Sequence, residues 1–276
     1  MTIKQIIKKY SNELREVTHI PSKEVEILVM YLLEKNVIWL HLNYDKPFEK
    51  EKELDKLVKK RATHFPMEYI TGKASFFGEQ FYTHEKVLIP RPETEILVEK
   101  TKEILENITN PKVIEIGTGS GIISVMLALL IEKIEITAVD INDNALQLAK
   151  KNAKKFGVDH KINFINSNLF TNIKNIDYNL CVSNPPYIAN NYKLPTNVKY
   201  EPSNALFGGI VGDELLIDII NISNDNNIKY LCCEMGYDQK EPLGKLFKSL
   251  NTKKVAFYKD YSDFDRGFCI EFNNSK

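Results

Sequence analysis

The sequence has no surplus of charge of either sign. Its 276 residues include 37 lysines and arginines and 37 aspartates and glutamates, so the formal net charge is zero. Proteins that bind duplex DNA usually carry a basic surplus, because phosphate contacts supply much of their affinity. A local basic patch is still compatible with this balance, but we expect no stable nucleic-acid partner.

Cysteines are few, and they lack the spacing of a metal site. Cys181, Cys232, Cys233 and Cys269 form no C-x-x-C pair, and no histidine cluster accompanies them. The first three lie in apolar runs, where a reduced thiol behaves as a small buried hydrophobic group. We therefore expect no metal, and reduced thiols fit a cytoplasmic protein.

Long hydrophobic runs are missing as well. Lysines interrupt the apolar positions of the first residues, MTIKQIIKKYSNEL, unlike the continuous apolar core of a secretory signal. No run reaches the length that a membrane-spanning helix needs. With 43% hydrophobic and 27% charged residues, the chain is predicted to be a soluble, monomeric globular protein without membrane contact.

The first part of the chain has the apolar spacing of amphipathic helices. Ile3, Ile6, Ile7 and Tyr10 recur at three- and four-residue steps. A second helix is expected after Pro21-Ser22, with Ser22 as its N-cap. These patterns predict a small helical bundle.

Alternating aromatic and apolar residues follow this bundle. Thr71-Gly72 breaks the helical pattern, and residues 74–89 alternate around Gly78, which predicts a β-hairpin. We therefore predict three parts, namely a helical domain over 1–72, a β-hairpin linker over 73–90 and a larger domain over 91–276.

Strands and helices alternate in this larger domain, which predicts a mostly parallel sheet covered on both faces. The fold class is therefore α/β. Strands are predicted at residues 112–116, 135–139, 162–165, 178–182 and 229–234. Helices are predicted at residues 93–105, 120–131, 143–156 and 213–222. Residues 255–258 and 267–272 are expected to add an antiparallel pair at the edge of the sheet.

A glycine-rich turn, Glu115-Ile116-Gly117-Thr118-Gly119-Ser120-Gly121, joins the first of these strands to a helix. Glycines there allow a sharp turn and the close approach of a ligand. A dinucleotide fingerprint would need glycine at position 122, where isoleucine stands, so the spacing favours S-adenosylmethionine over NAD. Glu115 also suits a cofactor that carries a sulfonium and an ammonium group. We predict that Glu115, Gly117, Thr118, Gly119, Ser120 and Gly121 bind this cofactor.

Asp140 ends the next predicted strand. A carboxylate at this place accepts hydrogen bonds from both hydroxyls of a ribose, although alone it would equally cap the helix that begins near Asp143. Its combination with the glycine turn favours the role of cofactor ligand.

The tetrapeptide Asn184-Pro185-Pro186-Tyr187 directly follows a third strand. Two prolines alone would make only a rigid turn. The Asn184 side-chain oxygen and the Pro185 carbonyl can each accept one N–H of an NH₂ group, which would direct the nitrogen at a methyl carbon. Tyr187 offers a flat face for the substrate. Asn184, Pro185 and Tyr187 are thus the candidate catalytic residues, Asn184 to Tyr187 the candidate substrate site, and Asn184 also a cofactor contact.

Several further segments carry a resemblance to a known family. They are Pro66 to Gly72, Phe76-Phe77-Gly78, Val87 to Glu95, Glu201-Pro202, Ala205-Leu206, Gly208-Gly209, Glu234, Gly236, Gln239 and Asp265-Arg266. With the glycine turn, Asp140 and Asn184 to Tyr187, they make the chain similar to the HemK-type release-factor glutamine N5-methyltransferases. The stretch Leu-Ile-Pro-Arg-Pro-Glu-Thr-Glu is the most specific part of the match.

The resemblance implies a Rossmann-like, seven-stranded methyltransferase domain that uses S-adenosylmethionine without a metal. It also implies that the methyl acceptor is the glutamine of the Gly-Gly-Gln loop in class I peptide chain release factors. By the same analogy Asn168 and Leu169 line the cofactor site, and residues 89–94 help to close it. The helical domain is expected to recognise the body of the release factor, because one glutamine on a loop offers little surface for specificity.

The sequence departs from the family pattern at three positions. Asn168 stands where the family usually has aspartate, and Glu115 replaces the commoner aspartate. Gly267 occupies a position that is usually apolar, which leaves the start of the last strand open.

Three other functions remain open at this point. A ribosomal protein is an alternative acceptor of the same chemistry. An adenine-N6 DNA methyltransferase would use a similar tetrapeptide on a flipped base, although no target-reading domain is evident. A binding module that has lost catalysis is the third alternative, against which the intact Asn184 and glycine turn argue.

Overall fold

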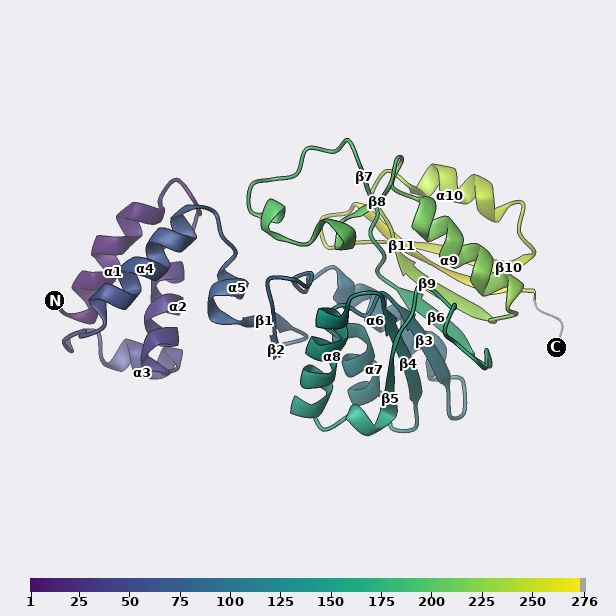
Figure 1. Cartoon of the computed structure of the whole chain (residues 1–276), viewed down its shortest axis with the longest axis horizontal. Coiled ribbons are helices and arrows are strands. Elements are labelled where there is room, and N and C mark those ends of the chain that lie inside the picture. The colour runs from purple at the N-terminus through teal and green to yellow at the C-terminus, as the bar shows by residue number, and fades with distance from the viewer. Residues whose placement is uncertain (274–276) are drawn as a thin grey trace. The chain divides into compact units, whose positions relative to one another are not determined.

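The computed structural model describes residues 1–273 (Figure 1). The described chain divides into two compact units. The first contains Met1–Lys73 together with Leu194–Tyr200, and the second contains the remaining residues. No helix among the described residues is both long and apolar enough to cross a membrane.

The first unit is a bundle of short helices whose apolar stripes face one another. Its helices are α1 (Ile3–Ser11), α2 (Pro21–Leu33), α3 (Val37–Leu42), α4 (Glu51–Ala62) and α5 (Met67–Thr71). Thr2 and Gln5 form a capping box at the start of α1. The predicted cap Ser22 is wrong: α2 begins at Pro21, because proline is well suited to the first helical position, and its N-cap is Ile20.

A segment far along the chain completes this unit. The short turn Val198–Tyr200 brings the Tyr200 hydroxyl to the Thr63 carbonyl oxygen, to which it donates a hydrogen bond of 2.9 Å. The Tyr200 ring also packs edge-on against Phe65, with 5.1 Å between the ring centres. The helical unit is therefore held partly by residues outside the predicted range 1–72.

The second unit is built on a seven-stranded sheet, and the predicted α/β class is confirmed. Its strand order is β10-β11-β9-β6-β3-β4-β5. The strands are β3 (Lys112–Ile116), β4 (Glu135–Asp140), β5 (Ile162–Asn166), β6 (Leu180–Ser183), β9 (Tyr230–Glu234), β10 (Thr252–Lys259) and β11 (Asp265–Phe272). The five strands from β9 to β5 are parallel, and the antiparallel β11 and β10 form the predicted edge pair.

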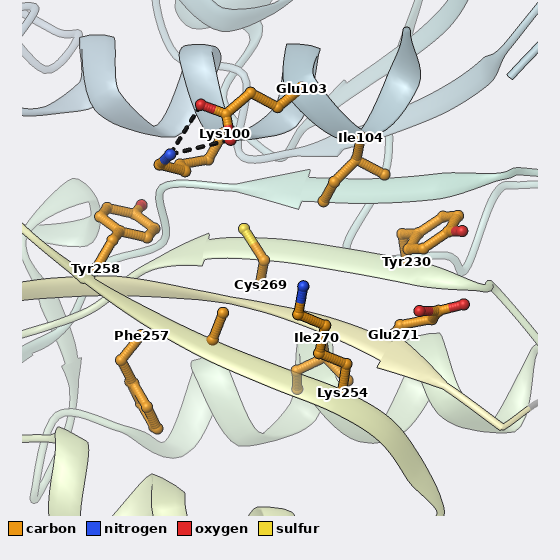
Figure 2. Close-up of a pocket in the computed structure, with 11 residues that line it drawn as sticks. Lys100, Glu103, Ile104, Tyr230, Lys254, Phe257, Tyr258, Cys269, Ile270 and Glu271 are labelled. Carbon is orange, nitrogen blue, oxygen red and sulfur yellow. Dashed lines mark hydrogen bonds and ion pairs between the residues drawn. The ribbon is translucent and has the colours of Figure 1, made fainter. Parts of the chain in front are cut away.

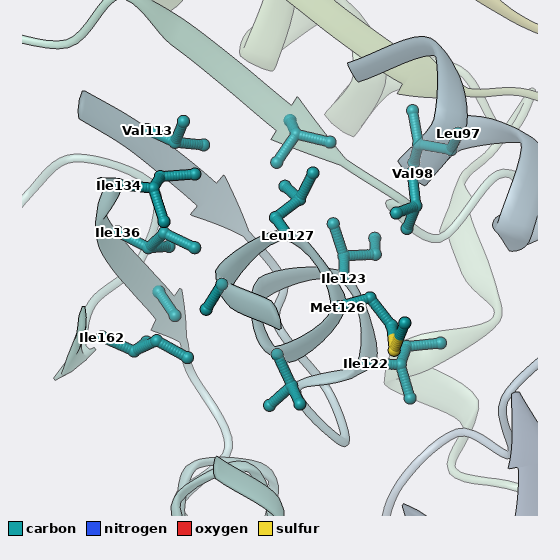
Figure 3. Close-up of a cluster of buried hydrophobic side chains, with 14 of the residues drawn as sticks. Leu97, Val98, Val113, Ile122, Ile123, Met126, Leu127, Ile134, Ile136 and Ile162 are labelled. Carbon is teal, nitrogen blue, oxygen red and sulfur yellow. The ribbon is translucent and has the colours of Figure 1, made fainter. Parts of the chain in front are cut away.

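Helices cover both faces of the sheet (Figure 1). On one face lie α6 (Thr94–Leu105), α7 (Ile122–Leu130) and α8 (Asp143–Lys155), and on the other α9 (Glu214–Asp225) and α10 (Lys240–Phe247). Because side chains alternate along a strand, Val113 packs towards Leu127 of α7 in the cluster of Figure 3, while Ile114 packs towards Ile219 of α9. Buried on both faces, the central strands are almost wholly apolar.

The hairpin is shorter than the alternation predicted. It consists of β1 (Lys73–Phe76) and β2 (Glu79–Tyr82), and residues 83–93 form no strand. Asn152 of α8 holds the end of β2, because it accepts a hydrogen bond from the Tyr82 N–H and donates one to the Tyr82 carbonyl. Beyond Tyr82 the backbone has side-chain partners instead of a neighbouring strand: the Ile89 N–H donates to a Glu201 carboxylate oxygen at 3.0 Å.

One pair of strands in this unit was not predicted. Residues Ile188–Ala189 and Phe207–Gly209 pair as a small parallel sheet, β7 with β8. The glycine at position 267 lies inside β11, where a Cβ atom would stand 2.2 Å from the Tyr258 hydroxyl oxygen. Glycine at this position therefore makes room for a buried tyrosine.

Candidate functional site

A cavity lies where β3, β4, β5 and β6 end, within the second unit. The carboxyl ends of parallel strands are the usual ligand site of an open α/β sheet. Ile116 ends β3 and Gly117 follows it, Asp140 ends β4, Ser167 follows β5 and Asn184 follows β6. The other lining residues are Lys86, Val87, Leu88, Gly119, Ile141, Asn142, Ala145, Asn168, Leu169, Pro186, Pro202, Asn204, Ala205 and Leu215.

The glycine turn presents bare backbone to this cavity. Gly117 and Gly119 line it, with φ of 71° and 54°, in the left-handed region that glycine adopts without strain. The N–H groups of Gly117 and Thr118 both donate to the Val139 carbonyl at 2.9 Å, which fixes the turn against β4. A Cβ atom on Gly117 would meet nothing within 4 Å, so a ligand has room to approach the backbone there.

Glu115 is placed differently from our expectation, because it does not line the cavity. It is fully buried, and one carboxylate oxygen accepts hydrogen bonds from the Thr118 hydroxyl at 2.8 Å and from the Ser124 N–H at 3.2 Å. The Ser124 hydroxyl donates to the same oxygen. Burial raises the pKa of Glu115 to about 7, although these hydrogen bonds oppose the shift. The side chain thus binds the start of α7, where the N-cap Gly121 has no side chain to do so.

Thr118, Ser120 and Gly121 are also absent from the lining. Gly121 is the N-cap of α7, so the helix begins at Ile122 and not at Ser120 as predicted. A Cβ atom on Gly121 would stand 2.8 Å from the Ala149 Cβ of α8. The Ser120 carbonyl accepts a hydrogen bond of 2.8 Å from Asn152. Gly121 and Ser120 therefore pack the turn onto α8.

Asp140 faces the cavity, and both of its carboxylate oxygens are oriented by backbone groups. One oxygen accepts from the Gly119 N–H at 2.9 Å, and the other from the Asn142 N–H at 2.8 Å. Burial raises the pKa of Asp140, and the backbone hydrogen bonds counteract the shift. Each carboxylate oxygen has a further lone pair, so the group can still accept hydrogen bonds from two hydroxyls.

Asn168 and Leu169 lie together at the cavity. Leu169 has φ of 48°, and its carbonyl accepts a hydrogen bond of 2.8 Å from the buried Ser167 hydroxyl. Ser167 itself donates its N–H to the Asp140 carbonyl at 3.1 Å. Ser167, which we did not predict, therefore connects the two segments of the lining that carry Asp140 and Asn168.

The Asn184 side chain lines the cavity and is anchored from behind. Its amide nitrogen donates a hydrogen bond of 3.1 Å to the Thr94 hydroxyl oxygen. Thr94 is the first residue of α6 and is 1% exposed. With the nitrogen engaged, the Asn184 side-chain oxygen remains as an acceptor for another partner.

Only one of the other three residues in the tetrapeptide lines the cavity, namely Pro186. Pro185 is buried. The Tyr187 carbonyl accepts a hydrogen bond of 3.1 Å from Gln239, and its hydroxyl accepts one of 3.4 Å from Arg266. Burial raises the pKa of Tyr187 to about 12. The structure therefore shows Tyr187 as an anchor of the tetrapeptide, and its contact with a substrate plane stays a prediction.

Two walls of the cavity carried no predicted role. Residues 86–88 form one, and Pro202, Asn204 and Ala205 belong to the other. Glu201 connects them, because its carboxylate accepts hydrogen bonds from the Ile89 N–H and from Arg91. The family resemblance had singled out the segments Val87 to Glu95 and Glu201-Pro202, which belong to these walls. Their positions along the sequence gave no reason to expect them side by side.

A second cavity lies elsewhere in the same unit, between α6 and the edge strands (Figure 2). It is lined by Lys100, Glu103 and Ile104 of α6 and by residues of β9, β10 and β11, among them Tyr230, Tyr258 and Cys269. It contains none of the predicted site residues. Among the described residues, no cluster of His, Cys, Asp and Glu is placed to hold a metal ion.

Comparison with known proteins defines the class first. Residues 92–200 match the family model described as Methyltransferase small domain, and residues 5–72 match the PrmC N-terminal domain. Human METTL16 structures are similar in fold at 19% identity. The catalytic domain in complex with MAT2A 3′UTR hairpin 6 has a TM-score of 0.60 over 72% of this chain and 77% of that chain. The N-terminal domain in complex with SAH has a TM-score of 0.53 over 71% and 76%. The second unit thus has a Rossmann-like methyltransferase fold.

The particular family follows from sequence identity over nearly the whole chain. The release factor glutamine methyltransferase of Aquifex aeolicus is 34% identical over 96% of this chain and 93% of its own length. The protein of that name from Buchnera aphidicola is 32% identical over 96% and 98%. The chain belongs to the release factor glutamine methyltransferases.

Proposed function

We propose that this protein transfers a methyl group from S-adenosylmethionine to the side-chain amide nitrogen of the glutamine in the Gly-Gly-Gln loop of class I peptide chain release factors. The observation that carries the proposal is the presence of Asn184, the glycine turn and Asp140 in the lining of one cavity. The names of the curated relatives support the same substrate. A substrate from the translation apparatus implies a cytoplasmic reaction, and we propose that the enzyme acts as a monomer.

The cavity lining fits the proposed methyl donor. The open space at Gly117 admits a ligand to the backbone, and Asp140 retains acceptor capacity for two ribose hydroxyls. Ile141, 57% exposed, offers an apolar surface beside Asp140 for a flat base. We propose that Gly117, Gly119, Asp140, Asn168 and Leu169 bind S-adenosylmethionine, which supplies an electrophilic methyl group. Glu115, Thr118, Ser120 and Gly121 would support this site from behind.

The chain's own contribution to the reaction is the control of a poor nucleophile. The lone pair of an amide nitrogen is delocalised into its carbonyl group. The Asn184 side-chain oxygen would accept one N–H of the glutamine NH₂, and the Pro185 carbonyl would accept the other. Two acceptors in fixed directions favour a pyramidal nitrogen whose lone pair points at the methyl group. Tyr187 would keep the tetrapeptide in place through its contacts with Gln239 and Arg266.

Mass spectrometry of a release factor after incubation with enzyme and S-adenosylmethionine tests the proposal. We expect one added methyl group on the loop glutamine, and none on a release factor in which this glutamine is replaced. Asn184→Ala should lower kcat on the order of a hundredfold, because one aligned acceptor is lost from the transition state.

Cofactor affinity, measured by calorimetry, should stay close to wild type in Asn184→Ala, which separates catalysis from binding. Methylation of a ribosomal protein or of DNA in place of the release factor would refute the substrate. Near wild-type turnover of Asn184→Ala would remove Asn184 from the mechanism.

A further inference from the structure

Two cysteines face each other across neighbouring strands, and neither lines the cofactor cavity. Cys232 of β9 and Cys269 of β11 are directly opposite in the antiparallel register. The Cys232 thiol donates a hydrogen bond to the Cys269 sulfur, with 3.0 Å between the two Sγ atoms. Opposite residues of antiparallel strands have Cα atoms about 4.5–5.5 Å apart, and disulfides span Cα distances of about 4.4–6.8 Å. The backbone spacing of this pair therefore suits a disulfide.

The other two cysteines lie on the opposite face of the sheet. Cys232 belongs to the apolar cluster beneath α6 and α7, against which Cys269 packs. Cys181 and Cys233 belong to the cluster beneath α9 and α10, and they are two residues out of register in the neighbouring strands β6 and β9. Because side chains alternate along a strand, Cys233 points away from Cys232. The sheet thus favours one pairing, between Cys232 and Cys269.

A small molecule can reach one sulfur of this pair. Cys269 lines the cavity between α6 and the edge strands, and Figure 2 shows its sulfur directed into that cavity. The cavity volume is about 340 Å³, which is typical of small-molecule sites. Cys232 is 0% exposed, and burial raises the pKa of its thiol well above the usual value. A reagent therefore meets Cys269 first, and Cys232 lies behind it.

The charged groups around this cavity favour an anionic reagent. The lysines that line it, or form ion pairs with Glu271 in its lining, are Lys100, Lys229, Lys253 and Lys254. The carboxylates of the lining are those of Glu103 and Glu271. An excess of positive groups attracts anions, most strongly at low ionic strength.

We propose that Cys269 and Cys232 form a thiol–disulfide exchange site whose substrate is a small disulfide that carries carboxylates. The Cys269 sulfur gives up its proton and attacks one sulfur of the small disulfide. The S–S bond of the small disulfide breaks, and its leaving sulfur takes up a proton. Cys232 then attacks the Cys269 sulfur of this mixed disulfide, and its proton leaves with the second small thiol. The two cysteines are oxidised to a disulfide, and the small disulfide is reduced to two thiols.

Mass spectrometry of the full-length protein tests the exchange, with oxidised glutathione as the reagent. After incubation the protein is unfolded and its remaining thiols are alkylated. We expect alkyl groups on Cys181 and Cys233 alone, and a disulfide between Cys232 and Cys269 that dithiothreitol opens. If oxidised glutathione is added in concentrated urea instead, this selectivity should be lost, because it depends on the fold.

Three variants separate the two steps. Cys232→Ser should stop the reaction at the mixed disulfide, so that one glutathione stays on Cys269. Cys269→Ser should take up no glutathione, because Cys232 is out of reach. Cys233→Ser is the matched control: Cys233 is as buried as its neighbour in β9 but lies on the other face, so the cross-link should form as in the wild type.

A second reagent tests the charge of the substrate. Cystamine, a disulfide that carries ammonium groups, should react several times more slowly than oxidised glutathione at low salt. Faster reaction with cystamine would overturn the assigned substrate class. A wild type that keeps its four thiols reduced, or glutathione on Cys269→Ser, would overturn the site itself. The wild-type result needs no substitution and no methyl transfer, so it decides the inference even where a variant fails to fold or the proposed function is wrong.

Discussion

Glu115 shows how one side chain can serve a ligand site without touching it. The carboxylate binds the N-terminal turn of α7 through Ser124 and the glycine turn through Thr118. A carboxylate at a helix N-terminus compensates the unpaired N–H groups there. Glu115 therefore shapes the backbone that Gly117 and Gly119 present to the cavity.

The same burial makes Glu115 a source of pH-dependent stability. Its pKa rises from 4.5 to about 7 on folding, so the folded state binds the proton more tightly than the unfolded chain. Its favourable contribution is complete below pH 4.5 and is lost as the pH rises through about 7. Glu115→Gln should thus gain stability relative to wild type between pH 5 and pH 8, by on the order of 2 kcal/mol.

Urea denaturation at the two pH values measures this difference. Glu135→Gln is the control, because Glu135 is exposed at the start of β4. The effect of this substitution on the free energy of unfolding should be nearly the same at pH 5 and at pH 8. If Glu115→Gln and Glu135→Gln changed the free energy of unfolding equally between the two pH values, the carboxylate of Glu115 would be solvated.

At the scale of elements, the packing of α7 against α8 fixes the backbone conformation of the glycine turn. Gly121 combines φ of 81° with a distance of 2.8 Å from its would-be Cβ to the Ala149 Cβ. Asn152, one turn further along α8, holds both the turn and the end of β2. The position of α8 is therefore tied to the backbone that lines the cofactor site.

Gly121→Ala should be costly for two reasons that a control can separate. The left-handed conformation costs about 1–2 kcal/mol with a side chain, and the clash with Ala149 adds a similar amount. Gly157→Ala has φ of 70° but meets nothing within 4 Å, so it incurs only the first cost. In urea denaturation Gly121→Ala should therefore lose about 3 kcal/mol and Gly157→Ala about 1 kcal/mol. Equal losses would contradict the packing role.

At the scale of the whole molecule, the helical unit remains without a part in the chemistry. The cavity belongs to the second unit, whereas the first is a bundle around residues such as Ile6, Leu28 and Leu54. A glutamine on one loop buries little surface, so a larger contact is needed for specificity. We propose that the helical unit supplies this contact with the body of the release factor.

Removal of residues 1–72 tests this role with two substrates. The loss in kcat/KM should be on the order of a hundredfold on the intact release factor, and far smaller on a short peptide that carries the loop. The peptide also serves as the control for folding, because Tyr200 loses its partners Thr63 and Phe65 in this variant. Equal losses on both substrates would contradict a recognition role.

The sequence by itself determined where most strands and helices lie and which residues with functional chemistry follow the strands. Strands β3, β4 and β9 were predicted to within a residue or so, because buried parallel strands are short apolar runs bounded by polar residues. The glycine turn, Asp140 and Asn184 stood out because their chemistry follows from residue type and from their places after strands. Short-range patterns of this kind need no knowledge of neighbours in space.

Only the tertiary structure decided which side chains meet. It turned Glu115 away from the cavity, stopped the hairpin at Tyr82 and brought Glu201 to Ile89, from which it is 112 residues distant. It also placed Thr94 against Asn184 across 90 residues. The order of strands in the sheet and the packing of helices over it create these contacts, and neither is written in the periodicity of any single segment.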